Sequence, residues 1–231
     1  MGRQLSNWKR LTSTIPIVAI MSDPIAYGLV TSLSHPGGNV TGASVDAGID
    51  IWVKRIALLK EAVPSMTRVF YVAPDTTWTT AVGVGVKAAA EKANIELVGP
   101  PVENPHQEGQ YATAFSGVSK RADAILVSSA PENWSNKEHI VKFAQNNRLP
   151  ALYPYKDYVD VGGLMSHDID LNELWIRLAD QIAFIFKGAN AGDLPIYQPR
   201  QFRFVINMIA ARTIGLQFSQ NLIAMADEVI D

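Results

Sequence analysis

Residues 15–42 read IPIVAIMSDPIAYGLVTSLSHPGGNVTG, and this stretch decides the fold class. Its apolar run, Ile15 to Met21, is followed at once by Ser22, Asp23 and Pro24. Ser22 or Asp23 can cap a helix that begins at Pro24, because proline fixes φ near the helical value and lacks an N–H that the first turn does not need. A helix N-terminus therefore follows a predicted strand directly. Open α/β sheets bind polar or negative groups of small ligands at such positions.

Short β-branched runs alternate with amphipathic stretches along the rest of the chain, which is typical of a parallel sheet covered by helices. We therefore predict an α/β fold. Apolar residues at helical spacing predict one helix that ends at Pro64 and a longer one from Leu171 to Ile185. Ser135 and Glu138 predict a capping box at the start of another helix. The predicted strands are Ile15–Ile20, Arg68–Val72, Ile95–Val98, Ala124–Ser128, Ala151–Tyr153, Gly163–Ser166 and Arg203–Ile206.

Two glycine-containing segments divide this series and predict two lobes that face a cleft. Gly38–Asp50 is rich in Gly, Asn, Thr, Ser and Asp, and it separates the first strand–helix unit from the β/α series that starts near Ile51. Gly162–Ser166 is the second predicted crossover. We expect a first lobe from residues 1–44 plus about 167–200, and a second lobe from 45–166, with 201–231 returning across the hinge.

Composition limits the class of partner. The chain has 231 residues, 48% of them hydrophobic, and its 20 basic and 22 acidic residues give a net charge of -2. Because there is no block rich in Lys and Arg, we expect a small-molecule partner and no nucleic acid. The sequence contains no cysteine, which excludes a disulfide framework and leaves the redox compartment open.

The N-terminal region resembles an export signal only superficially. Arg3, Lys9 and Arg10 precede the apolar run Ile15–Met21, but that run is short, contains Pro16 and is not followed by a small-residue cleavage site. A buried strand is the favoured interpretation, and we expect no visible export signal. No apolar stretch approaches the ~20 residues of a membrane span, so none is predicted.

Polar side chains follow three of the predicted strands at the point where each strand ends. Because the carboxyl ends of parallel strands lie at one edge of a sheet, these groups can converge on one ligand. Each of them taken alone is more typical of a helix cap, but their recurrence after three strands makes ligand binding an equal alternative. Aromatic side chains beside the same loops either wall a cleft or pack in the core. The polar residues are Ser22, Asp23, Asp75, Thr76, Thr77, Ser128 and Ser129, and the aromatic residues are Trp78, Trp134 and Tyr155.

Motifs for catalysis are not found. Gly83 and Gly85 mimic a dinucleotide fingerprint, but they lie past Trp78 within a predicted helix and the final glycine is missing, which favours close helix packing. The four histidines show no metal-ligand spacing, and neither a nucleophile elbow nor a phosphate-binding loop is present. We therefore expect no enzymatic activity, no metal and no cofactor.

Five segments in order carry a family resemblance: TIPIVAIMSDPIAYGLVTSLSHPGGNVTG (14–42), LLKEAVPSMTRVFYVAP (58–74), GGLMSHDIDL (162–171), LPIYQPRQFRFVINMIAARTIGL (194–216) and ADEVID (226–231). Together they resemble the ABC transporter substrate-binding protein family that includes tryptophan- and tyrosine-binding members. The resemblance is collinear from about Thr14 to Asp231. Its most specific element is the Asp-Pro pair followed by Pro-Gly-Gly-Asn-Val-Thr-Gly.

The resemblance implies a type I periplasmic-binding fold whose two α/β lobes close over a solute and deliver it to a membrane permease. It also implies a periplasmic or extracytoplasmic location. We expect a small polar or aromatic-containing solute, such as an amino acid or a related compound. The alternatives are a ligand-sensing regulatory domain of the same fold and, less favoured, a doubly wound α/β enzyme. The predicted ligand-binding residues are Ser22, Asp23, Asp75, Thr76, Ser128, Ser129 and Tyr155.

This sequence departs from the family pattern in three ways. Only Met1–Ser13 precede the strand that resembles the last of the first lobe's opening series, so we expect an incomplete first lobe. The signal or lipid-anchoring cysteine is absent. The resemblance to the amino-acid-binding branch implies a Thr-Asp pair after the fourth predicted strand, but this chain has Ser128-Ser129-Ala130 there. A ligand ammonium group therefore lacks its expected carboxylate partner there.

Overall fold

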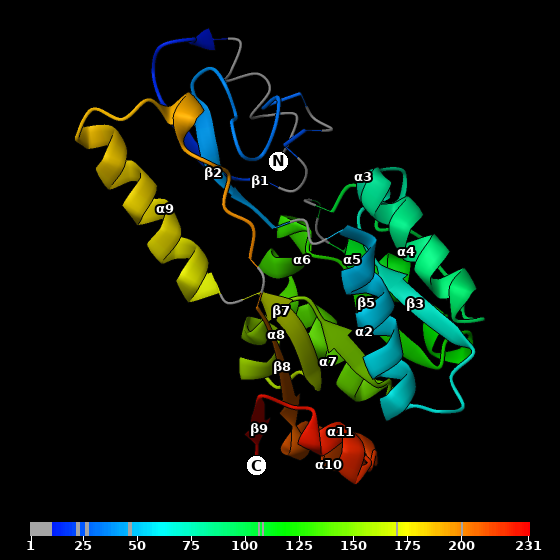
Figure 1. Cartoon of the computed structure of the whole chain (residues 1–231). Helices are drawn as coiled ribbons and strands as arrows, with labels where there is room; N and C mark the ends of the chain where they lie inside the picture. The colour runs from blue at the N-terminus through cyan, green and yellow to red at the C-terminus, as the bar shows by residue number, and fades with distance from the viewer. Residues whose placement is uncertain are drawn as a thin grey trace. The chain divides into compact units, whose positions relative to one another are not determined.

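The computed structural model describes residues 11–21, 24–25, 28–45, 48–105, 107, 109–169, 171–199 and 201–231. The chain divides into two compact units (Figure 1). Unit 1 comprises Met1–Ala47 and Ile169–Phe202, and unit 2 comprises Gly48–Asp168 and Arg203–Asp231. The chain therefore passes from one unit to the other three times.

Unit 2 is built on a sheet whose strands are β3 (Arg68–Val72), β4 (Glu96–Val98), β5 (Ala124–Val127), β6 (Ala151–Tyr153), β7 (Met165–Ile169), β8 (Phe202–Asn207) and β9 (Glu228–Ile230). Their order is β4-β3-β5-β6-β7-β8-β9, and the first five pair in parallel. The backbone N–H of Asn207 donates to the carbonyl of Leu164, which joins the end of β8 to the residue before β7. β8 and its parallel neighbour β9 therefore run opposite to β7. The predicted α/β fold with mostly parallel strands is confirmed.

Helices cover both faces of this sheet. Val69 and Tyr71 of β3 point to one face, and Phe70 and Val72 point to the other, and all four are fully buried. The first face packs against α2 (Gly48–Ala62), α4 (Ala81–Lys92), α10 (Met208–Ile214) and α11 (Gln220–Ala224). The second packs against α5 (Gln110–Phe115), α7 (Lys137–Asn146) and α8 (Lys156–Asp160). Three short elements complete the unit: α3 (Asp75–Trp78), α6 (Pro131–Ser135) and η1 (Val118–Lys120).

Unit 1 contains the parallel pair β1 (Ile17–Met21) and β2 (Val40–Ser44), together with α9 (Leu171–Phe186) and η2 (Ala191–Asp193). Gly42 in β2 has φ +138°, and a Cβ there would lie 2.7 Å from the backbone nitrogen of Ala19. Only glycine permits this close pairing. The segment Gly38–Asp50, predicted as a crossover, thus contains a strand, and the chain leaves unit 1 after Ala47.

One side of α9 packs on this strand pair and the other side is exposed. Leu174 and Leu178 belong to a core cluster with Ala43 and Ile169. The exposed large apolar side chains include Trp175, Ile176, Phe184 and Phe186. Among the described residues, no helix combines the length and the apolar composition needed to cross a membrane.

The predicted capping box is wrong. Ser135 closes α6, where its hydroxyl donates to the carbonyl of Pro131 at 3.1 Å, and Asn136 separates it from α7. The short α6 uses the serine inside the preceding turn, so the hydroxyl does not cap the next helix. The strand β9 was not predicted, because it is a short run whose stability comes from pairing with β8.

Gly83 lies where α4 approaches the end of α3. A Cβ at this position would lie 2.6 Å from the carbonyl oxygen of Thr77 and would also meet the carbonyl of Trp78. Because these neighbours are backbone atoms, they cannot rotate away. The prediction of close helix packing is confirmed, and the glycines lie inside α4, not in a turn after a strand.

The variant Gly83→Ala tests this packing. Alanine ordinarily stabilises a helix interior by ~0.5–1 kcal/mol relative to glycine. Here we expect the free energy of unfolding to fall by roughly 1–3 kcal/mol, because the new methyl group overpacks the contact with α3. Urea unfolding followed by circular dichroism measures the change. The control Val84→Ala, one residue away and 61% exposed, should change stability by at most about 0.5 kcal/mol. A stabilised Gly83→Ala variant would contradict the structure.

Candidate functional site

The carboxyl ends of β3, β5, β6 and β7 lie at one edge of the unit 2 sheet, because these strands are parallel. The predicted site residues Asp75 and Thr76 follow β3, Ser128 and Ser129 follow β5, and Tyr155 follows β6. Ser22 and Asp23 lie outside the described residues. We refer to this edge, with the loops and helix starts that follow the four strands, as the carboxyl edge.

Asp75 and Thr76 form the exposed first turn of α3. The Asp75 carboxylate accepts a hydrogen bond of 2.6 Å from the backbone N–H of Thr76. Among the described residues, no hydrogen bond joins either of them to Ser129 or Tyr155. They lie at the same edge as the other predicted residues, but as a separate surface feature.

Ser128 is buried and belongs to a hydrogen-bond network that sequence reasoning missed. The Asn133 amide nitrogen donates to the Ser128 hydroxyl at 2.9 Å and to the Val72 carbonyl at 2.9 Å. The Asn133 amide oxygen accepts from the Tyr111 hydroxyl at 2.8 Å. The fully buried Asn133 thereby ties the end of β5 to the end of β3. The only sequence signal for Asn133 was its place in the short segment that follows the predicted strand Ala124–Ser128.

Ser129 and Tyr155 are half-buried and lie together. Burial raises the pKa of the Tyr155 phenol, while the positive charge of Arg55 and the hydrogen-bonding hydroxyl of Ser129 lower it. The phenol is therefore neutral at physiological pH and available as a donor or acceptor. Ser129 is close enough to affect the pKa of the Tyr155 phenol, so these two predicted residues lie near each other at the carboxyl edge.

Arg55 reaches the same edge from α2 and was not predicted. Its Nε and Nη2 donate to the His167 carbonyl at 3.0 and 2.8 Å, and Nη2 also reaches the Pro154 carbonyl at 3.5 Å. The guanidinium carbon lies 4.8 Å from the Trp52 ring centroid. Burial lowers the Arg55 pKa to about 10, so the group stays charged at neutral pH. The sequence signal was its place on the apolar stripe of α2, three residues after Trp52.

Asp168 ends the unit 2 part of β7 and is 5% exposed. Its carboxylate accepts a hydrogen bond from the backbone N–H of Lys156. Burial raises the Asp168 pKa to about 7, against the opposing effects of the Lys156 N–H, Arg55 and Arg203. Burial and the charge of Arg55 lower the pKa of the adjacent His167 to about 4. At neutral pH the histidine is therefore uncharged, and the aspartate is ionised in only part of the molecules.

The predicted aromatic residues differ in their surroundings. Trp78 is half-buried with its ring centroid 5.2 Å from that of Tyr71, which is a core-packing arrangement. Trp134 is 44% exposed, its indole N–H donates to Asp157 at 2.8 Å, and Lys137 Nζ lies 4.5 Å from its ring centroid. Trp134 therefore presents aromatic surface close in sequence to Ser129.

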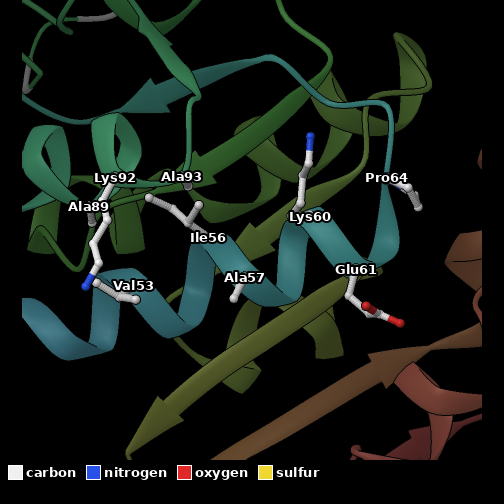
Figure 2. A pocket seen from close by; sticks show the side chains of 9 residues that line it. All are labelled: Val53, Ile56, Ala57, Lys60, Glu61, Pro64, Ala89, Lys92 and Ala93. Carbon is white, nitrogen blue, oxygen red and sulfur yellow. The ribbon is translucent and has the colours of Figure 1, made fainter.

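Two hollows occur away from these residues. A surface hollow of about 540 Å³ lies between α2 and α4, and Figure 2 shows Lys92 and Glu61 among its lining residues. A second hollow of about 590 Å³ lies in unit 1 along α9 and includes Gln181 and Tyr197. Neither contains a predicted ligand-binding residue. In the part of the chain that the structure describes, no cluster of three or more His, Asp and Glu side chains is placed to hold a metal ion.

The Asp168→Asn variant tests the environment at the end of β7. The pKa of this carboxyl is raised in the folded state, so its ionisation costs stability increasingly as pH rises from about 4 to 7 and fully above pH 7. The asparagine still accepts from Lys156 but carries no charge. At pH 8 we expect the variant to gain at least about 1 kcal/mol relative to wild type, or about 2–4 °C in Tm. At pH 4 the gain should vanish. Calorimetry showing equal Tm differences at both pH values would refute the raised pKa.

The comparisons with known proteins agree with one another. A model of the family described as ABC transporter substrate binding protein matches residues 7–230. A tyrosine-binding protein from Clostridioides difficile (strain R20291) is 26% identical over 208 residues, which cover 89% of this chain and 59% of that protein. The chain thus spans less than two thirds of the length of this curated relative.

Two solved structures match nearly the whole chain. One is an ABC domain from Streptococcus pneumonia in complex with L-Trp, 25% identical, with a TM-score of 0.85, covering 99% of this chain and 78% of that one. The other is a conserved domain protein from Vibrio cholerae O1 biovar eltor str. N16961, also 25% identical, with a TM-score of 0.86, covering 99% and 76%. The α/β fold matches that of type I periplasmic-binding proteins. Since the family model also spans almost every residue, the chain belongs to the ABC transporter substrate-binding protein family.

Proposed function

We propose that this protein is the solute-binding component of an ABC importer and that its solute binds at the carboxyl edge of unit 2. The observation that carries this proposal is the position of Ser129 and Tyr155, two half-buried polar side chains that follow neighbouring parallel strands at the same edge of the sheet. The buried side chains of Arg55, which is charged, and Asp168, which is partly ionised, lie near Tyr155. Such a combination of a few placed polar groups with buried charges is typical of small-molecule sites.

The proposed solute is small and carries a polar group together with an aromatic or apolar part. Tyr155 and the exposed ring of Trp134 offer aromatic surface for it. The names of the relatives support this class, since one is a tyrosine-binding protein and one was solved with L-Trp. An aromatic amino acid or a related compound therefore fits best.

The remaining parts of the proposal rest on family membership. A binding protein of this family is not an enzyme, and its partner would be the membrane permease of the importer. We propose an extracytoplasmic location on the same ground. Asp75 and Thr76 are proposed as further contacts, and Ser128 as a contact or as support for Ser129 through Asn133. Ser22 and Asp23 stay predicted contacts from the sequence.

Calorimetric titration of the whole 231-residue chain with L-tryptophan and L-tyrosine tests this function. We expect one solute per chain, and we expect Ser129→Ala and Tyr155→Phe each to weaken binding about 5- to 10-fold. A lost hydrogen bond of ~1–1.5 kcal/mol accounts for this change.

Ser135→Ala is the matched control, because its hydroxyl is exposed and bonds only within α6. This control should leave the affinity unchanged. Binding that is equally insensitive to Ser129→Ala and Tyr155→Phe would place the solute elsewhere.

A further inference from the structure

The guanidinium of Arg55 is a buried positive charge that forms no ion pair with a described residue. Its side chain is 3% exposed, and the two nitrogens that form hydrogen bonds donate only to the neutral carbonyls of His167 and Pro154. Among the described residues, no carboxylate oxygen lies within 4.0 Å of it. The third nitrogen, Nη1, makes no hydrogen bond with a described residue.

Burial of a charge is unfavourable unless an opposite charge or sufficient hydrogen bonds compensate for it. Asp168 is the nearby acid, but its carboxylate bonds to the Lys156 N–H and forms no ion pair with Arg55. Because burial disfavours its ionised form, Asp168 supplies only part of a counter-charge at neutral pH. Hydrogen bonds that hold the ends of β6 and β7 together require only N–H donors. The neutral amide of a glutamine side chain would also provide such donors. Apart from its contact with the Trp52 ring and the partial counter-charge of Asp168, the Arg55 charge has no partner among the described residues.

The hydrogen bonds to His167 and Pro154 and the stacking on Trp52 instead hold the guanidinium in a fixed orientation. A guanidinium that is already oriented binds a carboxylate with little loss of side-chain entropy. Its place at the ends of β6 and β7 puts it beside Tyr155, whose pKa it lowers. Donors from both residues are thus available to one anionic group.

We propose that Arg55 binds the carboxylate of the solute, so that the carboxylate is the required group and an ammonium group is dispensable. This inference rests on the proposed function and names the substrate class of the same site. It agrees with the run Ser128-Ser129-Ala130, which offers no carboxylate to an ammonium group.

Asp168 should couple this binding to pH. The charged and titratable groups around it are Arg55 on α2, Lys156 and Asp157 on α8, Arg203 on β8, and Tyr155. An arriving carboxylate is repelled by the ionised form of Asp168 and not by the protonated form. Binding should therefore strengthen as pH falls through about 7, with proton uptake by the aspartate.

The test compares three probes that share an indole ring: L-tryptophan, indole-3-propionate without the ammonium group, and tryptamine without the carboxylate. The matched phenol series is L-tyrosine, 3-(4-hydroxyphenyl)propionate and tyramine. We expect calorimetry on the whole chain to show binding of the indole series, the phenol series or both. In a series that binds, the Kd of the probe without the ammonium group should lie within about tenfold of the Kd of the amino acid. The amine should bind at least about 100-fold more weakly.

Two variants and one control complete the test. Arg55→Gln should weaken the binding of the carboxylate-containing probes at least about 30-fold and should leave the weak affinity for the amine probe unchanged. Asp168→Asn should remove the difference in affinity between pH 6 and pH 8. Lys54→Gln is the control, since it removes an exposed positive charge from the adjacent position of α2 and should change affinity less than about twofold. The probe comparison in the wild-type chain stands even if Arg55→Gln does not fold.

The outcomes separate this inference from the proposed function. Tight binding of tryptamine or tyramine, or carboxylate binding that survives in folded Arg55→Gln, would overturn the role of Arg55 and leave the binding function intact. Binding of none of the six probes would overturn the proposed aromatic solute, and with it this inference.

Discussion

The parallel pairing of β3, β5, β6 and β7 is the constraint on which the rest of unit 2 depends. In its register Val72 lies opposite Val127, Leu126 opposite Leu152, and Tyr153 opposite Ser166. Both faces of these strands are covered by helices, so a shift of one residue would exchange two buried sets of side chains. Because all four strands run the same way, whatever follows each strand collects at one edge. For this reason Ser129 and Tyr155, which follow β5 and β6, lie at the same edge as Asp168 near the end of β7, although they are distant in sequence.

Buried polar groups then give that edge its chemical character. Asn133 joins the ends of β5 and β3 through neutral hydrogen bonds, and its donors and acceptor are all used. Arg55 joins the ends of β6 and β7 in the same way, but it also brings a charge that the described residues do not neutralise. Two similar supports therefore differ in consequence. Asn133 only holds the strand ends together, whereas Arg55 also leaves a positive charge, without an ion-pair partner among the described residues, at the edge where we propose that the solute binds.

The sequence predicted the sheet well, because β-branched runs such as Arg68–Val72 and Ala124–Val127 and their alternation with amphipathic helices depend on local pattern. It missed β9, whose pairing is set by tertiary context, and the need for glycine at position 42 of β2 is evident only from the backbone of Ala19 that lies against it. At the carboxyl edge, residues in loops after strands were predictable. Arg55 and Asn133 were not, because a polar residue on a helix stripe or in a short helix shows its role only when its distant partners are known. The contacts proposed for Ser22 and Asp23 stay predictions.

The central claim is that solute binds at the carboxyl edge of unit 2, and hydrogen–deuterium exchange measures this most directly. The whole chain is compared with and without saturating L-tryptophan or indole-3-propionate. Our account predicts slower exchange in peptides that contain Ser129–Ala130 and Tyr155–Asp157, where backbone amides lie beside the proposed contacts. Protection confined to α9 and Pro195–Gln198 of unit 1, with no change at the carboxyl edge, would contradict it.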